Sequence, residues 1–569
     1  MPSQLDLDLE RAFASHAVPG GLLETKPFPV PRFGVDMPLL VHGPPSLAHY
    51  FQHFCAEQGD KTFLVDGDLR LSFAETFAAA RVAAGGLVAG HGLRKGEFVG
   101  IAARNSVSWV VAYMAVLMAG GCVALLNGWW QGGELVEGIR LGPCRLVIAD
   151  ESRARRIEGL DHGAEILLIR HDCPPLEGLA TLTARGGGAD TPLPDLTGDD
   201  RATMLFTSGS TGQSKGAWSD HRGVVQATMN YLAQSIAILG LMAERGELPT
   251  EQPTALVNVP LFHVTGEVPL LLQSFAQGRK LVLMAKWDAV EAMRLIERER
   301  CTYFVGVPLM SYEIATHPDR DKYDLSSCVT FAAGGAPRPV EHVKRIRDAL
   351  PQGFPIIGYG LTETNGVGCG NFNENYLAKP TSTGRASPPL VDLAIMDDDG
   401  NVLPQGSMGE ICIRSICNFI GYWNNDAATA EAFFANGYFR SGDLGYLDED
   451  GYLFIVDRKK DIIIRGGENI SCIEVEGAIY ANPAVAEASV FGLPDPRYGE
   501  VPAAVYLVKD GETLAPDQLR DFLASRIAPF KMPVRFWQVR DALPRLGTEK
   551  VDKRSLREKY TAEWQREHA

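Results

Sequence analysis

The chain lacks the close cysteine and histidine spacings from which metal sites and disulfide frameworks are built. Its ten cysteines are scattered over 569 residues, with no C-x-x-C pair and no Cys/His cluster at zinc spacing. We therefore expect neither a structural zinc nor a fold held by disulfides. Free thiols suit a reducing compartment, and the sequence predicts a cytoplasmic protein.

Positive charge is also scarce. Lysine and arginine number 54 against 70 aspartates and glutamates, which gives a formal net charge of -16. Nucleic-acid binders are usually basic, so we expect no nucleic-acid partner. Nucleotides are not excluded, because a local cluster of N–H groups, lysine and Mg²⁺ can hold an anion on an acidic protein.

Long uncharged hydrophobic runs are few. The uncharged run at residues 109–126 is eighteen residues long, which is close to the length of a membrane span. Gly120 and Gly121 divide it into about eleven helical residues and a five-residue strand, and no basic flank supports insertion. The first residues, MPSQLDLDLERAF, lack the basic and apolar regions of a signal peptide. We expect a buried helix feeding a strand, and no transmembrane segment.

The chain is too long for one core, and its patterns divide it into regions. Residues 1–45 are rich in proline and short on periodicity, which predicts an extended arm over a folded body. From residue 46 to about 456, helical stretches alternate with β-rich runs, which indicates βαβ units and mainly parallel sheets. Within this part, DDDG, LPQG and DEDG turns between about 391 and 454 predict a smaller β-rich subdomain. Residues 462–569 suffice for an α+β module. The clearest expected strands are 98–102, 146–149, 256–259, 303–307 and 356–359.

Residues 207–216, TSGSTGQSKG, combine five hydroxyls, three glycines and one lysine. Glycines let backbone N–H groups approach an anion, hydroxyls donate to phosphate oxygens, and Lys215 adds a mobile charge. A P-loop NTPase motif would need Gly directly before this lysine and Ser or Thr directly after it, whereas Ser214 precedes Lys215 and Gly216 follows it. Taken alone, the segment is a phosphate-binding loop or an ordinary flexible connector.

Three further motifs carry chemistry, and each has a plainer alternative. Thr362 and Glu363 follow an apolar run in IIGYGLTET, where they could bind phosphate and Mg²⁺ or simply cap a helix. Asp443 in GYFRSGDLG could accept hydrogen bonds from both ribose hydroxyls or be an exposed turn aspartate. Lys550 ends LPRLGTEK and, considered by itself, is an ordinary surface lysine.

In this order the motifs resemble the adenylate-forming superfamily of acyl-CoA synthetases, nonribosomal adenylation domains and beetle luciferases. The resemblance covers about residues 46 to 560. It implies an α/β N-terminal domain of two stacked α/β subdomains plus a small β-rich subdomain, followed by a smaller, mobile α+β C-terminal domain. The motifs are TSGSTGQSKG, PLFHVTG (260–266), GGAP (334–337), YGLTET, RSGD, DRKKD (457–461), RGGENI (465–470) and LPRLGTEK.

The resemblance implies an AMP-forming acyl-CoA ligase that uses ATP, Mg²⁺ and CoA. A carboxylate would attack the α-phosphate of ATP and release diphosphate, and the acyl-adenylate would then pass its acyl group to a thiol. A medium- or long-chain fatty, alicyclic or arylalkanoic monocarboxylic acid is the expected substrate, because NGVGCGN (365–371) is small and no basic cluster suits a second carboxylate. Two alternatives stay open: a ligase that loads a separate carrier protein, and an AMP- or acyl-binding relative without catalysis.

The resemblance also assigns residues to the nucleotide. Lys550, Thr362 and Glu363 would act in catalysis, with Glu363 as the Mg²⁺ ligand, Thr211 as a weaker one, and Lys550 bridging carboxylate and α-phosphate. Asp443 and Arg458 would take the ribose. The phosphate-binding set is Thr207, Ser208, Gly209, Ser210, Thr211, Gly212 and Lys215, and the adenine set is Gly334, Gly335, Ala336, Pro337, Tyr359 and Gly360.

Other implied roles concern the acid, the thiol and the hinge. Residues 457–461 would form the hinge, centred on Lys460, about which the C-terminal domain rotates between half-reactions. Gly466, Gly467 and Glu468 would then line a CoA tunnel. His263 would be a catalytic gate between pocket and tunnel, although a buried structural histidine is the alternative. The acyl pocket would be formed by His263, Val264, Gly335, Gly360, Asn365, Gly366 and Val367.

Some features are not absorbed by the resemblance. Many relatives read T-G-K before the final lysine, whereas this chain has Thr548, Glu549 and Lys550, and the extra carboxylate leaves the lysine itself in place. The adjacent Trp129 and Trp130 would suit an interface, a membrane contact or partial burial. The oligomeric state is open, with a homodimer as one option.

Overall fold

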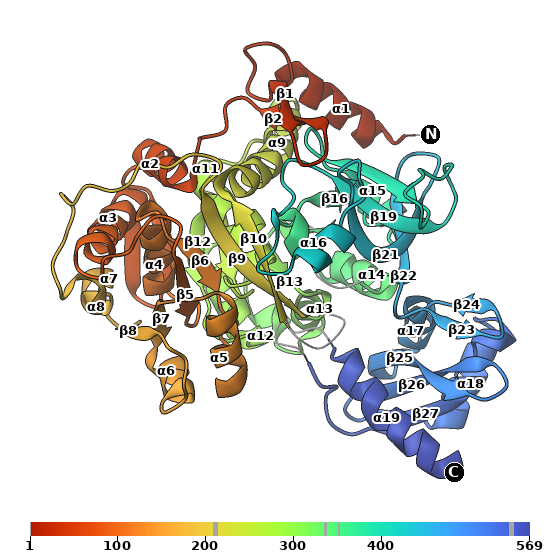
Figure 1. The fold of residues 1–569 in the computed structure, drawn as a ribbon. Helices are drawn as coiled ribbons and strands as arrows, with labels where there is room; N and C mark the ends of the chain where they lie inside the picture. The colour runs from red at the N-terminus through yellow and green to blue at the C-terminus, as the bar shows by residue number, and fades with distance from the viewer. Residues whose placement is uncertain (1, 209–213, 335–337, 351–352, 546–550, 569) are drawn as a thin grey trace.

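The structure is a computed structural model that describes residues 2–208, 214–334, 338–350, 353–545 and 551–568. A large body built of two stacked sheets and a β-rich subdomain carries the small C-terminal domain, drawn in blue, at one end (Figure 1). The stacked sheets share one hydrophobic core.

The first sheet has seven strands in the order β20-β10-β9-β6-β5-β7-β8. The strands from β9 to β8 run parallel, whereas β10 is antiparallel to β9 and to β20. The strands are β5 (Phe98–Ala102), β6 (Cys122–Leu125), β7 (Leu146–Asp150), β8 (Glu165–Ile169), β9 (Arg201–Ser208), β10 (Ser214–Asp220) and β20 (Gly421–Tyr422). The helices between them are α4 (Val107–Met118), α5 (Gly132–Leu141), α6 (Glu151–Ile157), α7 (Pro175–Gly178) and α8 (Ala180–Thr183).

The second sheet has nine strands in the order β17-β16-β15-β14-β13-β11-β12-β3-β4, parallel from β15 to β3 and antiparallel at both ends. Its strands are β3 (Thr62–Asp66), β4 (Leu69–Ser72), β11 (Thr254–Val257), β12 (Lys280–Leu283), β13 (Tyr303–Gly306), β14 (Thr330–Ala333), β15 (Phe354–Gly360), β16 (Gly368–Asn371) and β17 (Arg385–Ala386). The connecting helices are α10 (Val264–Gly266), the π-helical η1 (Glu267–Leu272), α11 (Gln273–Gln277), α12 (Ala289–Glu299), α13 (Pro308–Thr316), η2 (Arg320–Lys322), α14 (Val340–Ala349), η3 (Thr362–Thr364) and α15 (Asn373–Ala378).

The five strands expected from the sequence are all present, with ends shifted by up to two residues. The uncharged run at 109–126 is the core element that its glycines predict: every residue of α4 is buried, and β6 follows as a buried strand. The core helices beside α4 are α2 (Leu47–Gln58), α3 (Phe73–Ala89) and α9 (His221–Arg245). By length and composition alone α9 could cross a membrane, but half of its apolar window is buried inside the protein.

The β-rich subdomain is a four-stranded antiparallel sheet in the order β18-β19-β21-β22. Its turns coincide with the DDDG, LPQG and DEDG segments, as expected. The elements are β18 (Asp392–Met396), β19 (Gly409–Arg414), α16 (Asp426–Glu431), β21 (Phe439–Leu447) and β22 (Leu453–Arg458). Strand β22 runs directly into the segment that precedes the C-terminal domain.

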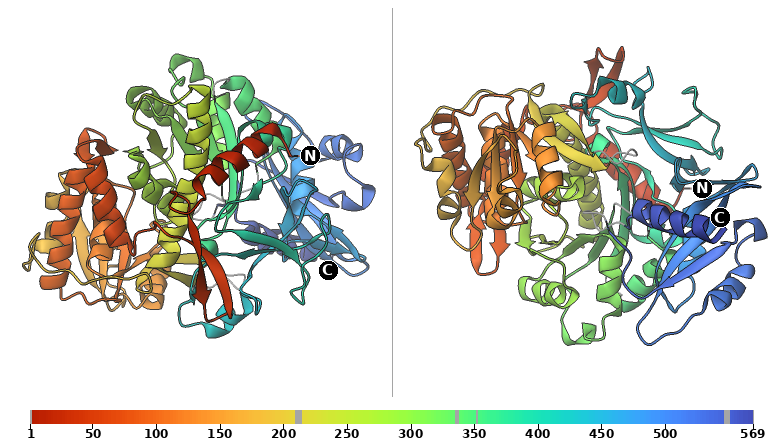
Figure 2. Two further views of the ribbon diagram at one scale, coloured as in Figure 1. Left: turned by 90° about the horizontal axis from the view of Figure 1, so that it is seen from above. Right: turned by 60° about the horizontal axis from the view of Figure 1, so that its bottom comes forward.

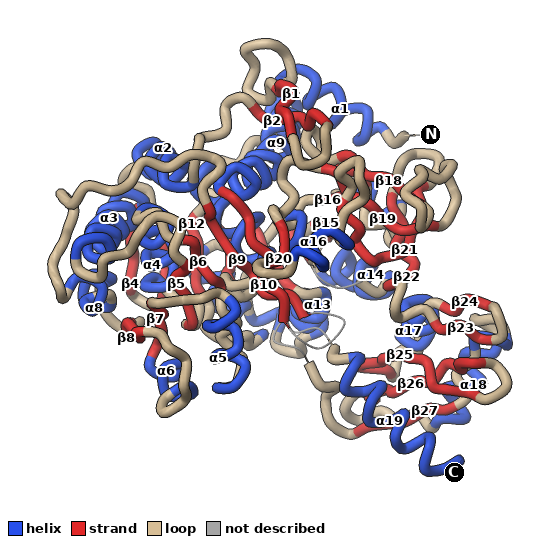
Figure 3. The backbone as a smooth tube through the Cα atoms, viewed as in Figure 1, coloured by secondary structure: helices blue, strands red, loops and turns tan. Residues whose placement is uncertain are grey.

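The C-terminal domain is a five-stranded sheet with helices packed on it (Figure 3). It has hydrophobic clusters of its own on both sides of the sheet. It meets the large body where the His342 ring, stacked on Tyr312, lies 6.2 Å from the ring of Tyr480. The elements are β23 (Ile463–Arg465), β24 (Glu468–Ile470), α17 (Cys472–Tyr480), β25 (Val485–Asp495), β26 (Gly499–Val508), α18 (Pro516–Ala524), η4 (Pro529–Lys531), β27 (Arg535–Val539) and α19 (Lys553–His568).

The N-terminal 45 residues differ from the extended arm that their prolines predicted. They form the helix α1 (Gln4–His16), which packs along α9, and a hairpin of β1 (Thr25–Val30) and β2 (Val35–Leu40) (Figure 2). A capping box between Ser3 and Asp6 starts α1. The buried Asp6 carboxylate also accepts hydrogen bonds from Tyr452 (2.9 Å) and Asn375 (3.0 Å), distant residues that local periodicity cannot reveal.

A buried carboxyl lies between the two sheets. Glu267, the first residue of η1, is fully buried, and its Oε1 accepts a 2.8 Å hydrogen bond from the hydroxyl of Tyr113 on α4. Its Oε2 has no hydrogen-bond partner in the part of the chain that the structure describes. Burial raises the pKa of Glu267 to about 7, because the charged form loses its hydration.

Replacing Glu267 by glutamine is expected to remove a pH dependence of stability. Because the pKa of this carboxyl is raised in the folded state, its contribution is complete below about pH 4.5 and is lost as the pH rises through about 7. Above that pH the buried charge lowers the free energy of unfolding of the wild type by up to about 3 kcal/mol, and Glu267→Gln lacks this penalty. The melting temperature of the variant should therefore rise relative to the wild type between about pH 5 and about pH 8.5. Tyr113→Phe keeps the carboxyl and should keep the dependence; an equal Glu267→Gln difference at both pH values would contradict the argument.

Candidate active site

The motif predicted to bind phosphate joins two paired strands of the seven-stranded sheet. Thr207 near the end of β9 pairs with Lys215 near the start of β10. Several predicted site residues lie outside the described residues: Gly209, Ser210, Thr211 and Gly212 between these strands, Gly335, Ala336 and Pro337 after β14, and Glu549 and Lys550 near the C-terminus.

Lys215 and Glu363 are brought together through Tyr422. The Lys215 ammonium lies 4.7 Å from the centre of the Tyr422 ring, a cation–π contact. The Tyr422 hydroxyl donates a 2.8 Å hydrogen bond to Oε1 of Glu363 in η3. Burial raises the pKa of Glu363, and the Tyr422 hydrogen bond and the charges of Arg458 and Lys215 oppose that shift. The site therefore holds a carboxylate beside two cations.

Tyr359, Asp443 and Arg458 form a second cluster. The Tyr359 hydroxyl donates a 2.7 Å hydrogen bond to Oδ2 of Asp443, and Nε of Arg458 lies 3.2 Å from Oδ1. Asp443 and Arg458 face each other across β21 and β22, so strand pairing sets their separation. Burial and the neighbouring Asp443 raise the pKa of Tyr359 well above its usual value, which keeps the phenol protonated as a donor.

The part of β21 that presents Asp443 is held by Glu410 of the neighbouring strand β19. This buried carboxylate accepts from the backbone N of Gly442 at 3.1 Å and pairs with Arg440 at 3.0 Å. It also lies 3.5 Å from Lys459, one residue before the predicted hinge residue. Glu410 thus connects this part of β21 to the segment leading into the C-terminal domain.

Part of the predicted acyl pocket is assembled. Gly366 adopts a φ of 81°, and a Cβ placed on it would lie 3.4 Å from Val264. The Gly360 backbone approaches Gly366 so closely that a Cβ at Gly360 would lie 1.9 Å from the Gly366 oxygen, which explains the glycine. His263 is half-buried and caps α10 by accepting from the backbone N of Thr265 at 3.3 Å.

Two predicted pocket residues turn into the core instead. The Asn365 side chain is fully buried and bonds to Ser219 Oγ (3.0 Å) and the Cys417 oxygen (2.8 Å). Val367 is 1% exposed and belongs to the main hydrophobic cluster. Neither side chain lines an open pocket. The motif gave their positions in the chain but not the direction of each side chain around the left-handed turn at Asn365.

The central residue of the predicted hinge and the segment assigned to the CoA tunnel lie on the surface. Lys460 is exposed between β22 and β23. Gly466, Gly467 and Glu468 are exposed in the β23–β24 hairpin, where both glycines have positive φ, so the turn itself requires them. The Gly466 N donates to the Tyr498 oxygen of the same domain at 2.8 Å. In this arrangement the hairpin is part of the C-terminal domain (Figure 1).

The donor set fits a magnesium ion that arrives with phosphates. Among the described residues no group of three or more His, Cys, Asp or Glu side chains could hold a metal. Glu363 supplies one buried carboxylate beside the phosphate-binding motif. Mg²⁺ in nucleotide sites is commonly held by one or two carboxylates, substrate phosphates and water, so a single protein ligand suffices.

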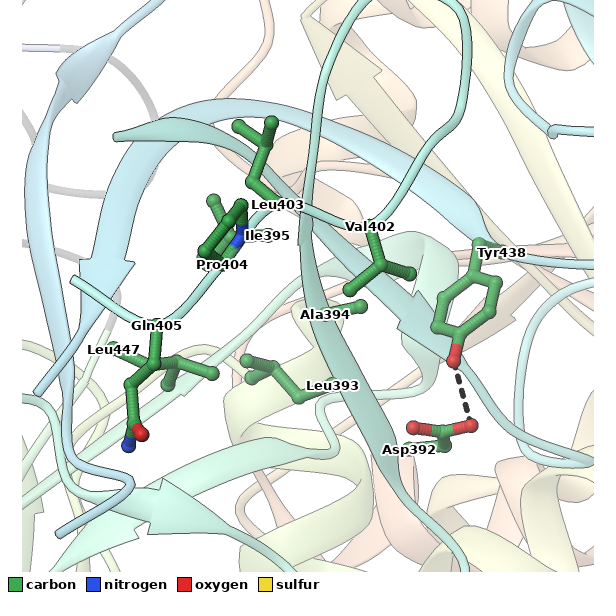
Figure 4. Close-up of a pocket in the computed structure, with 10 residues that line it drawn as sticks. All are labelled: Asp392, Leu393, Ala394, Ile395, Val402, Leu403, Pro404, Gln405, Tyr438 and Leu447. Carbon is green, nitrogen blue, oxygen red and sulfur yellow. Dashed lines mark hydrogen bonds between the residues drawn. The ribbon is translucent and has the colours of Figure 1, made fainter. Parts of the chain in front are cut away.

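A separate pocket of about 280 Å³ lies on the β-rich subdomain (Figure 4). Its polar residues include Asp392 and Tyr438, which bond to each other at 2.7 Å. The rest of its lining is mainly aliphatic, and it contains none of the predicted site residues. We assign it no role in the chemistry.

Tyr422 was not found from the sequence. It stands 59 positions from Glu363, which it contacts, in a segment without a recognisable phosphate or metal pattern. Only the pairing of β20 with β10 brings it beside the phosphate motif.

Comparison with known proteins agrees with this geometry. The model of the family described as AMP-binding enzyme matches residues 51–423, and that of the AMP-binding enzyme C-terminal domain matches residues 474–550.

Curated relatives align along most of their length. A ligase of Rhodococcus jostii (strain RHA1), named for a 7a-methyl-1,5-dioxo-octahydro-indenyl propanoyl group and CoA, is 33% identical over 88% of this chain and 96% of its own. The long-chain-fatty-acid–CoA ligase FadD13 of Mycobacterium tuberculosis (strain ATCC 25618 / H37Rv) is 32% identical over 87% and 94%.

Among solved structures, ATP-bound MatB from Rhodopseudomonas palustris superposes with a TM-score of 0.79 at 28% identity, covering 90% of this chain and 99% of that one. Together the matches confirm the resemblance and the predicted fold class. The chain therefore belongs to the AMP-binding enzyme family and is an acid–thiol ligase of the AMP-forming acyl-CoA synthetase type.

Proposed function

We propose that this ligase activates a medium- or long-chain, alicyclic or arylalkanoic acid and transfers the acyl group to CoA. A carboxylate oxygen attacks the α-phosphorus of ATP and diphosphate leaves; the CoA thiolate then attacks the acyl carbon and AMP leaves. The observation that carries the proposal is the pair of polar clusters, one around Glu363 and one around Asp443, joined by the short segment from Tyr359 to Glu363.

We propose that the Asp443 cluster binds the nucleoside. With one oxygen of its carboxylate bonded to Tyr359 and the other beside Arg458, Asp443 is fixed in orientation and keeps acceptor capacity for the ribose hydroxyls. The adenine would lie against Tyr359 and Gly360 and the segment that begins at Gly334. The remaining adenine contacts, from Gly335, Ala336 and Pro337, are assigned by resemblance alone.

We propose that the Glu363 cluster binds phosphates and Mg²⁺. Thr207, Lys215 and the hydroxyls and N–H groups from Ser208 to Gly212 would hold the β- and γ-phosphates, while Thr362 contacts the α-phosphate. Glu363 would ligate Mg²⁺, aided by Thr211, and Tyr422 would orient its carboxylate. Bound Mg²⁺ supplies neutralisation of phosphate charge during the displacement.

Lys550 and the hinge are proposed to divide the two half-reactions. The Lys550 ammonium would bridge the attacking carboxylate and the α-phosphate, stabilising negative charge as the bond forms. Rotation about Lys460 would then withdraw it and bring Gly466, Gly467 and Glu468 towards the thiol path, with His263 as the gate. An exposed hinge and an exposed hairpin suit such a rotation.

The acid is proposed to be larger than acetate. Gly366 adds no side chain beside Val264, which makes this part of the wall apolar. The relatives named for a dioxo-indenyl propanoyl group and for long-chain fatty acids are consistent with a roomy pocket. The ten cysteines are all free, nine of them buried, which supports our proposal of a reducing, cytoplasmic setting.

Incubation with ATP, Mg²⁺, CoA and a panel of acids should yield acyl-CoA, AMP and diphosphate in equal amounts. Acids of the proposed classes should be used better than acetate, because their apolar groups are buried on binding. Competing CoA against a purified carrier protein separates the ligase from a carrier-loading enzyme. Absence of AMP with every acid would refute the reaction, and activity confined to acetate would refute the substrate class.

Lys550→Ala should lose adenylation by roughly 100- to 1,000-fold, the usual effect of removing a group that stabilises transition-state charge. Acid-dependent exchange of labelled diphosphate into ATP measures this half-reaction. Transfer from a synthetic acyl-adenylate to CoA should be largely retained. Lys559→Ala, an exposed lysine on α19, is the matched control; equal exchange rates in the two variants would contradict the assigned role.

Tyr422→Phe should raise KM for MgATP and lower kcat/KM by roughly 10-fold, because Glu363 loses the donor that orients its carboxylate. Steady-state kinetics with MgATP varied will measure the effect. The control is Tyr438→Phe, which removes a tyrosine hydroxyl bonded to Asp392 within the β-rich subdomain. This variant should leave KM for MgATP unchanged. A Tyr422→Phe enzyme with wild-type KM would show that the hydrogen bond does not serve the nucleotide site.

A further inference from the structure

A buried arginine has hydrogen-bond donors that nothing in the structure satisfies. Arg279 follows α11 and immediately precedes β12, and it is only 6% exposed. Its Nε and Nη1 atoms are buried and have no hydrogen-bond partner among the described residues. Buried donors of a charged group are costly unless they are met, so this arrangement calls for an acceptor.

The contact recorded for the guanidinium is with an aromatic ring. Cζ of Arg279 lies 4.7 Å from the centre of the Tyr303 ring. Burial lowers the pKa of Arg279, and Tyr303 opposes that shift. Within the described part of the chain, no ion pair of Arg279 with a carboxylate is recorded, which distinguishes it from Arg440 and its buried partner Glu410.

Tyr303 places the guanidinium on the face of the nine-stranded sheet that meets α9. Side chains alternate along β13, so Tyr303 and Val305 share one face, and both contribute to the core cluster that includes Tyr231 of α9. Phe304, between them, belongs to the cluster on the opposite face. The face with Tyr303 is therefore the one that packs against the same core cluster as α9.

The strand also sets the distance to the reaction centre. Gly306 at the end of β13 accepts a hydrogen bond from the N of Gly334, the first residue of the predicted adenine set. Tyr303 lies three residues earlier, which is roughly 10 Å along the strand. Arg279 therefore lies at the far end of the sheet face whose near end borders the site.

Tyr231 links the two ends of this face. Its hydroxyl donates a 2.5 Å hydrogen bond to the oxygen of Gly366, at the predicted pocket wall. Tyr231 and Tyr303 pack against the same core cluster, and burial raises the pKa of Tyr231. Both rings are only half-buried although they pack against the central core cluster.

We propose that Arg279 and the Tyr303 hydroxyl form a distal subsite of the acyl pocket, which binds an oxygen acceptor of the substrate roughly 10 Å from the Gly306 end of β13. The acceptor is a ketone or a second carboxylate. This inference rests on the proposed function, since it concerns the acid that the ligase activates. It replaces the expectation from the sequence that no basic cluster suits a second carboxylate.

Such a subsite discriminates strongly against plain hydrocarbon acids. An acid without the oxygen would leave the buried donors of Arg279 unpaired, and sites of this kind reject analogues lacking the polar group far more effectively than apolar pockets reject size differences. Substrate preference is therefore the quantity to measure.

The experiment compares decanoic, 9-oxodecanoic and decanedioic acids, which share a chain length and differ at the distal end. In the wild type, kcat/KM for AMP release should be at least about 10-fold higher with one of the oxygenated acids than with decanoic acid. The better of the two identifies the acceptor as ketone or carboxylate. In Arg279→Met, a replacement of similar shape, that preference should be lost while decanoic acid is used at least as well as before.

Two further variants separate recognition from packing. Arg279→Lys keeps the charge and should retain part of any preference for decanedioic acid, and Tyr303→Phe keeps the ring and should weaken the preference less than Arg279→Met does. Ratios of kcat/KM within one preparation are independent of the folded fraction. If Arg279→Met does not fold, the wild-type and Tyr303→Phe ratios decide.

A wild type that uses decanoic acid as well as both oxygenated acids, or an unchanged ratio in Arg279→Met, would overturn the subsite and leave the ligase function standing. If none of these three acids and none of the acids in the wider panel supports AMP release, the result would instead count against the proposed function.

Discussion

The hydrogen bond between Tyr359 and Asp443 is the contact on which the arrangement of the site depends. It joins the nine-stranded sheet to the β-rich subdomain at the point where both present polar side chains. Asp443 is held from one side by this bond and from the other by Arg458, while Glu410 binds the backbone of the preceding Gly442. Since β22 continues from Arg458 into the segment before the C-terminal domain, the position of the nucleoside site and the start of the hinge are set by the same strand pair.

The chain's local patterns were sufficient for most of the architecture. Strands 98–102 and 303–307 were recognisable because a buried parallel strand is a short apolar run bounded by turns. The N-terminal helix was missed because its stability comes from Asp6, whose partners Asn375 and Tyr452 lie more than 350 residues away. Prolines at 27, 29 and 31 dominated the local pattern, and they belong to the hairpin that follows the helix.

For the site, the motifs identified the residues that carry chemistry but not those that orient them. Lys215, Glu363 and Asp443 stand in segments that can be recognised as motifs by their glycines and hydroxyl side chains. Tyr422 and Arg279 stand in ordinary apolar segments, and their importance follows only from the atoms that surround them. Asn365 illustrates the same limit: a motif fixes a position, whereas the backbone conformation, here a φ of 49°, decides where the side chain points.

Buried polar groups between the two sheets are therefore the most specific information that the structure adds. Glu267 and Arg279 flank the segment from η1 to β12, and both are buried with unpartnered atoms. Glu267 can relieve its burial by taking up a proton, as the rise of its pKa to about 7 indicates. A guanidinium has no such escape near neutral pH, because its pKa lies far above that range even when lowered. Of the two, only Arg279 must keep its charge. Its buried donors, beside Tyr303, can be paired by an acceptor that the substrate brings in.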